Sequence, residues 1–102
     1  MPSDTDMSSD RVEIMLDERD GRQLLSDGGS TFRHLQARAR TYLRVELAVA
    51  RELCLRHAVA VTHPRDGEPP RIERWLARGD DVGLAELQLR AAIDGVLCAA
   101  RR

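Results

Sequence analysis

The chain has 102 residues, of which 42% are hydrophobic and only 3% aromatic, and its formal net charge is −1. This length suits one domain with a core of its own and leaves no room for two. All sixteen basic residues are arginine, which excludes chemistry that depends on a lysine base or a lysine Schiff base. The scarcity of aromatic residues predicts a core of Leu, Val, Ile and Ala, which suits closely packed helices.

The two cysteines, Cys54 and Cys98, lie far apart in apolar surroundings. No cysteine or histidine pair has the spacing of a metal site, so we expect no metal and no cofactor. We expect both thiols to be free and buried, with a disulfide between two helices as the alternative. Residues 1–10 lack the features of a signal peptide, and no apolar run is long enough to cross a bilayer. The sequence therefore predicts a cytoplasmic protein without a membrane partner, with a disordered acidic tail at 1–10 and a single helical domain at 11–102.

Residues 11–25 fit either a short strand or a short helix. Val12, Ile14 and Leu16 recur with the period of two that is typical of a strand, and "RDG" after them would turn the chain back on itself. A capping-box pattern in "DRVE" would instead begin a short helix. We favour the strand.

A long helix is predicted from residue 32 to residue 61, after a break at "DGGST" in which Ser30 or Thr31 is a suitable N-cap. Its main apolar stripe steps by three or four residues, as a helix requires. A second apolar stripe adjoins this one near the middle of the helix, so we expect the helix to be covered on two sides. The positions of the main stripe are Phe32, Leu35, Ala39, Leu43, Leu47, Ala50, Cys54, Ala58 and Val61.

Two further helices are predicted after the proline-rich stretch "THPRDGEPPR". A short helix at residues 71–78 would bury Trp75, and Asp80 or Asp81 would cap a last helix from Val82 to about Ala100. The predicted fold class is therefore all-α, mostly helical, with a long, a short and a medium helix and a short N-terminal strand or helical turn. Three helices of unequal length bury such wide stripes poorly, so we predict that a homodimer completes the fold.

The charges are unevenly distributed along the chain. Residues 1–29 carry eight acids and three arginines, net −5, whereas residues 30–65 carry seven arginines and two acids, net +5. On the predicted long helix, arginines at intervals of seven, four and seven residues would form one row along the axis. The alternative is a solvated row that the N-terminal acids or Glu46 and Glu52 neutralise. The candidate partner-binding residues are Arg33, Arg40, Arg44 and Arg51, with Arg38 beside them.

This layout favours a non-enzymatic regulatory or adaptor protein that binds an acidic protein segment through the arginine row. No histidine, serine or cysteine has a partner at catalytic spacing, so no catalytic residue is predicted. Nucleic acid is the alternative partner, because "RVEIMLD" followed by "STFRHLQARARTYL" is similar to the ribbon-helix-helix repressors. That resemblance implies that Arg11, Glu13 and Met15 face DNA, but the glycines between the two segments and the N-terminal acids disfavour it.

The predicted order of helices, with its proline-rich link, also resembles the layout of the intertwined all-helical chorismate mutases. The resemblance covers residues 30–102 in outline and includes no detailed motif. It implies a small enzyme that holds a dicarboxylate with arginines. The lysine and the C-terminal glutamine or glutamate of that family have no counterpart here. The first candidate residues under this resemblance are Arg40, Arg51, Arg74 and Glu73.

Overall fold

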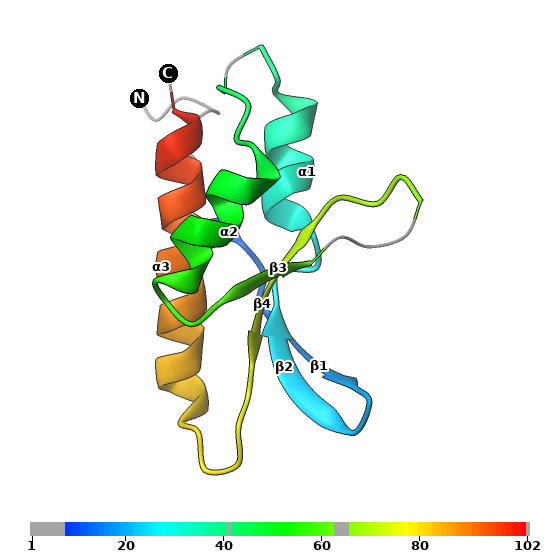
Figure 1. Ribbon diagram of the computed structural model, residues 1–102, viewed down its shortest axis with the longest axis vertical. Coiled ribbons are helices and arrows are strands. Elements are labelled where there is room, and N and C mark those ends of the chain that lie inside the picture. Colours follow the sequence, from blue (N-terminus) through cyan, green and yellow to red (C-terminus); the bar gives the residue numbers. More distant parts are fainter. Residues whose placement is uncertain (1–7, 41, 63–65, 102) are drawn as a thin grey trace.

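In the computed structural model, which describes residues 8–40, 42–62 and 66–101, a four-stranded antiparallel sheet packs against three helices (Figure 1). The strand order in the sheet is β1-β2-β4-β3. This α+β fold contradicts the predicted all-α fold and its plan of a long, a short and a medium helix. The elements in chain order are the 3-10 turn η1 (Ser9–Arg11), β1 (Met15–Arg19), β2 (Arg22–Ser26), α1 (Ser30–Ala37), α2 (Leu47–Leu55), β3 (Ala60–Thr62), β4 (Arg71–Trp75) and α3 (Val82–Ala100).

The first two strands form a hairpin at the "RDG" turn. Asp20 and Gly21 have φ values of 55° and 75°, and two positive φ values are what a two-residue turn between twisted strands requires. The strand prediction for residues 11–25 is therefore confirmed. Its bounds differ, because β1 begins only at Met15, and Val12 is buried ahead of the strand.

Strand β4 occupies most of the segment predicted to be the short helix at residues 71–78. Ile72, Trp75 and Leu76 are spaced three and four residues apart, which matches a helix, but the backbone of β4 bonds to β2 on one side and to β3 on the other. The hydrogen bonds of a central strand outweigh a local pattern of three apolar residues. The short helix was thus a wrong prediction, and Trp75 lies half-buried on the sheet.

The predicted long helix is also wrong, because α1 ends at Ala37, α2 begins at Leu47 and β3 already occupies residues 60–62. A continuous helix over residues 32–61 would measure about 45 Å at about 1.5 Å per residue. That exceeds the greatest extent of the molecule, which is 41 Å. Because the chain bends between them, α1 and α2 both pack against α3 and bury their apolar faces there.

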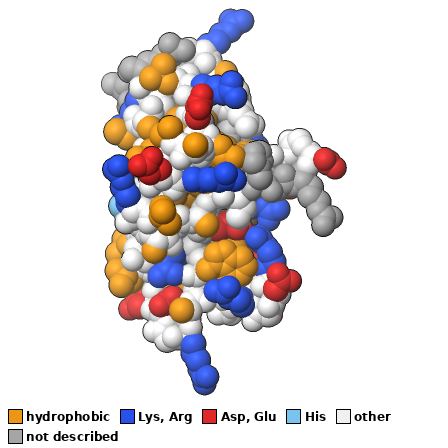
Figure 2. All heavy atoms as spheres, viewed as in Figure 1, with side chains coloured by type: hydrophobic (Ala, Val, Ile, Leu, Met, Phe, Trp, Pro, Cys, Tyr) orange, Lys and Arg blue, Asp and Glu red, His pale blue; other side chains and the backbone are white. Residues whose placement is uncertain are grey.

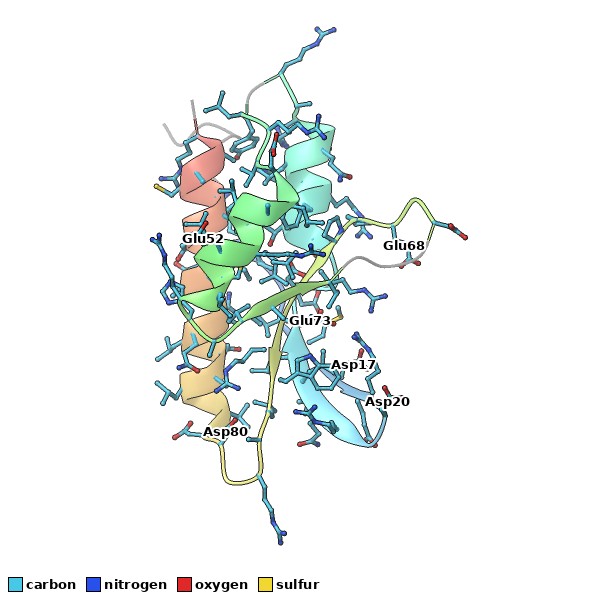
Figure 3. All side chains as sticks on the ribbon, viewed as in Figure 1. Asp17, Asp20, Glu52, Glu68, Glu73 and Asp80 are labelled. Carbon is cyan, nitrogen blue, oxygen red and sulfur yellow. The ribbon has the colours of Figure 1, made fainter. Side chains whose placement is uncertain are left out.

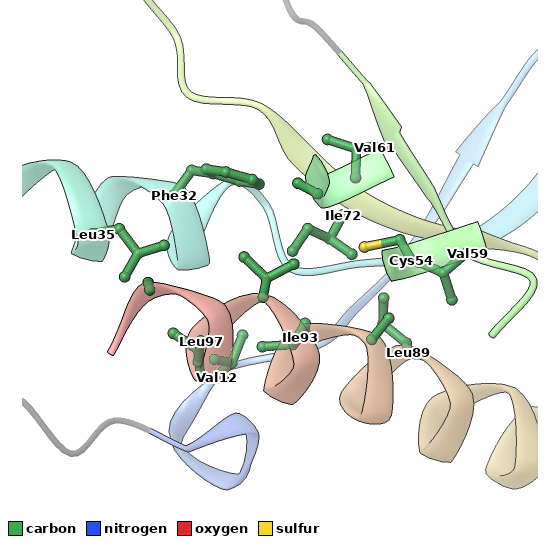
Figure 4. Close-up of a cluster of buried hydrophobic side chains, with 14 of the residues drawn as sticks. Val12, Phe32, Leu35, Cys54, Val59, Val61, Ile72, Leu89, Ile93 and Leu97 are labelled. Carbon is green, nitrogen blue, oxygen red and sulfur yellow. The ribbon is translucent and has the colours of Figure 1, made fainter. Parts of the chain in front are cut away.

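Helix α3 confirms the predicted last helix and is central to the core. Its N-cap is Asp81, whose carboxylate accepts a hydrogen bond from the backbone N–H of Leu84 at 3.1 Å. The core side of the sheet carries Leu25, Val61 and Ile72, which the register places on one face (Figure 4). The buried residues that α3 contributes are Ala85, Leu89, Ala92, Ile93, Val96, Leu97 and Ala100.

Asp27, rather than Ser30 or Thr31, caps the start of α1. One carboxylate oxygen of Asp27 accepts from the N–H of Gly29 at 2.8 Å and of Ile72 at 3.0 Å, and the other accepts from the N–H of Thr31 at 3.3 Å. The carboxylate is fully buried, and these three donors replace the water that it loses. A single side chain therefore joins β2, α1 and β4.

The N-terminal turn η1 is attached to α3. Ser9 donates hydrogen bonds from its N–H and its hydroxyl to the two carboxylate oxygens of Asp94, both at 2.8 Å. Arg90 donates to the carbonyl oxygens of Ser9 and Val12. Most of the predicted acidic tail, residues 1–7, lies outside the described residues.

Candidate functional site

The five candidate arginines do not form a row. Arg33 is on α1 and Arg38 follows its last residue, while Arg40 and Arg44 lie in the segment between α1 and α2, and Arg51 is on α2. Four of them are exposed and Arg38 is half-buried. The intervals of seven, four and seven residues align side chains only on a continuous helix, so the break between α1 and α2 removes the basis for the row.

The predicted neutralisation of these arginines is not seen either. Among the described residues, the ion pairs join Arg19 to Glu73, Arg71 to Glu68, Arg74 to Asp80 and Arg90 to Glu86. None of them includes Arg33, Arg38, Arg40, Arg44 or Arg51. Within the described part of the chain, the charge of this region is therefore not balanced by ion pairs with acidic side chains.

A groove of about 720 Å³ lies between α1, the segment after it and the start of α2. We refer to it as the α1–α2 groove. One of the predicted residues, Arg44, is part of its wall. The apolar side chains that line it are Phe32, Leu35, Ala39, Tyr42, Leu43, Val45, Leu47, Ala48 and Pro70, and the polar ones are Gln36, Arg44, Glu46 and Glu68.

The lining of the α1–α2 groove carries charges of both signs. Arg44 lines the groove, and residues 30–45, which form α1 and most of the segment after it, contain three further arginines outside the lining and no acid. Glu46 also lines the groove, and Glu68, labelled in Figure 3, reaches the groove from the chain before β4. An apolar groove whose lining holds one arginine and two glutamates suits an amphipathic ligand better than a simple anion.

His34 and Tyr42 hold the segment after α1 against that helix. Nε2 of His34 lies 3.1 Å from the hydroxyl of Tyr42, and the two rings meet edge to face at 5.5 Å. Burial, and secondarily the charge of Arg38, lower the pKa of His34 below its ordinary value of 6.5. Burial and the charge of Arg38 therefore favour the neutral imidazole.

A second cluster lies on the sheet face opposite the helices, where the register places Arg19, Arg22, Glu73 and Trp75 together. Both terminal nitrogens of Arg19 donate to the carboxylate of Glu73, at 3.1 and 2.6 Å, and this pairing raises the pKa of Arg19. The guanidinium groups of Arg19 and Arg22 lie 5.6 and 4.8 Å from the centre of the Trp75 ring. Figure 3 shows Glu73 over the middle of the sheet.

Sequence reasoning missed this cluster because it assigned Trp75 to a helical core. The signal was the alternation of Arg71, Glu73 and Trp75 with Ile72 and Arg74, which puts polar and aromatic groups on one strand face. Glu73 itself is fully buried by its neighbours on that face. The cluster is thus a rigid structural unit whose arginines and tryptophan reach the surface.

The structure contradicts the arrangements of helices and strands on which both family resemblances depended. Glu73 and Arg74 point to opposite faces of β4, where Glu73 bonds to Arg19 and Arg74 bonds to Gln88. They therefore do not form one pocket for a dicarboxylate, and the all-helical arrangement of the chorismate mutases is absent. The pattern of the ribbon-helix-helix repressors is also absent. Of Arg11, Glu13 and Met15, which that resemblance predicted to face DNA, Met15 alone lies in β1. Strand β1 moreover pairs with β2 of its own chain.

The two cysteines differ in burial, and the one in the core has low reactivity. Cys54 is fully buried, and burial raises the pKa of its thiol to about 12. Both thiols are free, but Cys98 is exposed on α3, which contradicts the expectation that it is buried. Within the described ranges, no three side chains of His, Cys, Asp or Glu lie together as metal ligands would.

Comparison of the chain with protein-family models, with curated proteins and with solved structures finds no match. Among the helices of the described residues, none has the length together with the apolar character that crossing a bilayer needs.

Proposed function

We propose that this protein is a non-enzymatic cytoplasmic adaptor that binds an acidic, amphipathic segment of a protein partner in the α1–α2 groove. The observation that carries the proposal is the groove itself, whose apolar floor adjoins a chain segment with four arginines and no acid. Apolar side chains of the partner would fill the floor, and its carboxylates would meet Arg44 and, at longer range, the other arginines of residues 30–45.

Arg44 is the arginine with the clearest role in this proposal, because it lines the groove directly. Arg33, Arg38 and Arg40 belong to the same basic segment and would add long-range attraction for an acidic chain. Arg51 lies on α2 outside the groove lining, so its contribution should be small. The homodimer expected from the sequence remains part of the proposal, but residues 32–61 cannot supply its interface as a single helix.

The test uses a fluorescein-labelled twelve-residue peptide with leucines at helical spacing and glutamates between them, titrated with the protein and followed by anisotropy. We expect Leu43→Asp, which puts a charge on the groove floor, to weaken binding at least about tenfold. Leu16→Asp is the matched control, because Leu16 is similarly exposed on β1 at 59% against 45% for Leu43.

A second pair of variants tests the charge. Arg44→Glu should weaken binding of the acidic peptide and improve binding of a peptide in which arginines replace the glutamates, whereas Arg51→Glu should change neither by more than about twofold. Equal binding by wild type, Leu43→Asp and Arg44→Glu would remove the groove as the site, as would a failure of the wild type to bind either peptide.

A further inference from the structure

Helix α3 has an apolar face that the described chain covers only in part, since Ala91 and Gly95 in its middle are half-buried. Leu84 and Leu87 are 57% and 64% exposed, and Cys98 further along the helix is exposed as well. At about 100° per residue, these three and the intervening Ala91 and Gly95 fall within a sector of about 80°. That sector is roughly opposite the side of α3 that packs on the sheet. A helix with apolar residues on two opposite sides is typical of one that is buried on both.

The position of α3 in the molecule leaves this face accessible. In Figure 1, α3 forms one edge of the fold, with α2 crossing it on one side. Figure 2 shows hydrophobic side chains gathered along the same edge, over the lower half of α3. An apolar strip of this length on a small protein is a candidate interaction surface.

Gly95 is a second and independent observation. A Cβ atom at Gly95 would meet nothing within 4 Å, and the backbone there does not need positive φ. Glycine inside a helix destabilises a protein relative to alanine, so its presence needs a reason. Within the described residues the structure offers none, but a close neighbour outside the fold would supply one.

We propose that two copies of the chain pair through this face, with their α3 helices antiparallel and a twofold axis at Ala91. Leu84 and Cys98 each lie seven residues from Ala91, and Leu87 and Gly95 each lie four residues from it. The axis therefore sets the large Leu87 of one copy against the partner's Gly95, where no side chain obstructs it. It likewise sets Leu84 against the smaller Cys98 of the partner. Large residues meet small ones on both sides of the axis, where the two Ala91 residues meet each other.

A parallel pair would lose this fit. It would set Leu84 against Leu84 and Leu87 against Leu87, while the two Gly95 positions would face each other across a gap. Opposed helix dipoles also favour the antiparallel pair.

The interface would involve about one helix from each copy, over about 21 Å of its length. Such a contact is small beside the 1,200–2,000 Å² of a standard stable interface, so we expect a dimer that dissociates in the micromolar range. Sedimentation of the full chain over a concentration series should show a mass that rises from 11.4 kDa toward twice that value.

Gly95→Leu is the decisive variant, because it should prevent dimerisation without lowering the stability of the single chain. It should abolish the rise in mass by filling the space that the partner's Leu87 needs. It should also leave the thermal unfolding temperature of the dilute protein unchanged or raised, since no atom of the described residues lies within 4 Å of a Cβ at this position. Leu87→Asp should likewise give a monomer, whereas Leu43→Asp, a control in the α1–α2 groove, should still dimerise. A Gly95→Leu variant that dimerises as the wild type does, or a wild type that stays at the mass of one chain at the highest concentrations, would overturn the proposal.

Oxidative crosslinking then tests the orientation. Leu84→Cys should form a covalent dimer with the partner's Cys98, and Leu84→Cys combined with Cys98→Ser should not. A wild type that crosslinks through Cys98 alone would show a parallel pair and refute the antiparallel one. These readouts do not depend on peptide binding, so failure of the dimer and failure of the proposed groove function are distinguishable.

Discussion

Removal of Arg19 tests whether the cluster on the open sheet face stabilises the fold. Arg19→Ala would leave the fully buried carboxylate of Glu73 without its bidentate partner. Breaking a buried ion pair from one side costs about 3–5 kcal/mol. The side chain of Arg19 is 35% exposed, so water would reach Glu73 in the variant and reduce the loss. We therefore expect a loss of about 2–3 kcal/mol, or about 10–20 °C in Tm for a domain of this size.

Urea and thermal unfolding, followed by circular dichroism and by the fluorescence of Trp75, would measure this loss. Glu68→Ala is the matched control, because the Arg71–Glu68 pair is longer at 3.5 Å and lies at the surface. That variant should stay within about 0.5 kcal/mol of the wild type. Replacing Arg19 and Glu73 together by Met and Leu should restore most of the stability. If Arg19→Ala costs no more than Glu68→Ala, the ion pair does not stabilise the sheet and the reasoning fails.

Three further outcomes follow from single side chains. Asp27→Ala should lower the unfolding free energy by about 2–4 kcal/mol in urea titrations, because three buried N–H groups lose their acceptor; a loss under 1 kcal/mol would contradict this role. Because the pKa of His34 is lowered in the folded state, the unfolded state binds the proton first, and stability should fall as the pH drops below about 6.5. Melting curves at pH 5 and pH 7.5 should show a smaller difference for His34→Gln than for the wild type, and an equal difference would refute this. Maleimide at pH 8 should label Cys98 of the dilute, monomeric protein rapidly and Cys54 only after unfolding, as mass spectrometry would show; early labelling of Cys54 would mean that the core opens.

The elements that could be predicted from the sequence are those with local signals. The hairpin has its turn in Asp20 and Gly21, and α3 has its N-cap in Asp81 and a long apolar period after it. Such signals act over a few residues and are readable without the rest of the fold.

The remaining elements depend on contacts that the local pattern does not contain. The apolar period continues through residues 32–61 because α1 and α2 pack on the same helix, so the period alone could not reveal the break between them. The segment of β4 is five residues long and fits both the helical period and the strand period. It forms a strand because β2 and β3 pair with it on its two sides. The α1–α2 groove likewise needs Pro70 to approach α1.

The attachment of Ser9 to Asp94 has a consequence for the rate of folding. These two residues are 85 positions apart, and the bond from Arg90 to the carbonyl of Val12 spans 78. Contacts of such sequence separation close only after most of the chain is ordered, and folding slows as their share rises. The hairpin can form early from its own turn, whereas η1 must wait until α3 has docked. Hydrogen exchange during refolding should therefore protect the amides of β1 and β2 before those of residues 9–12.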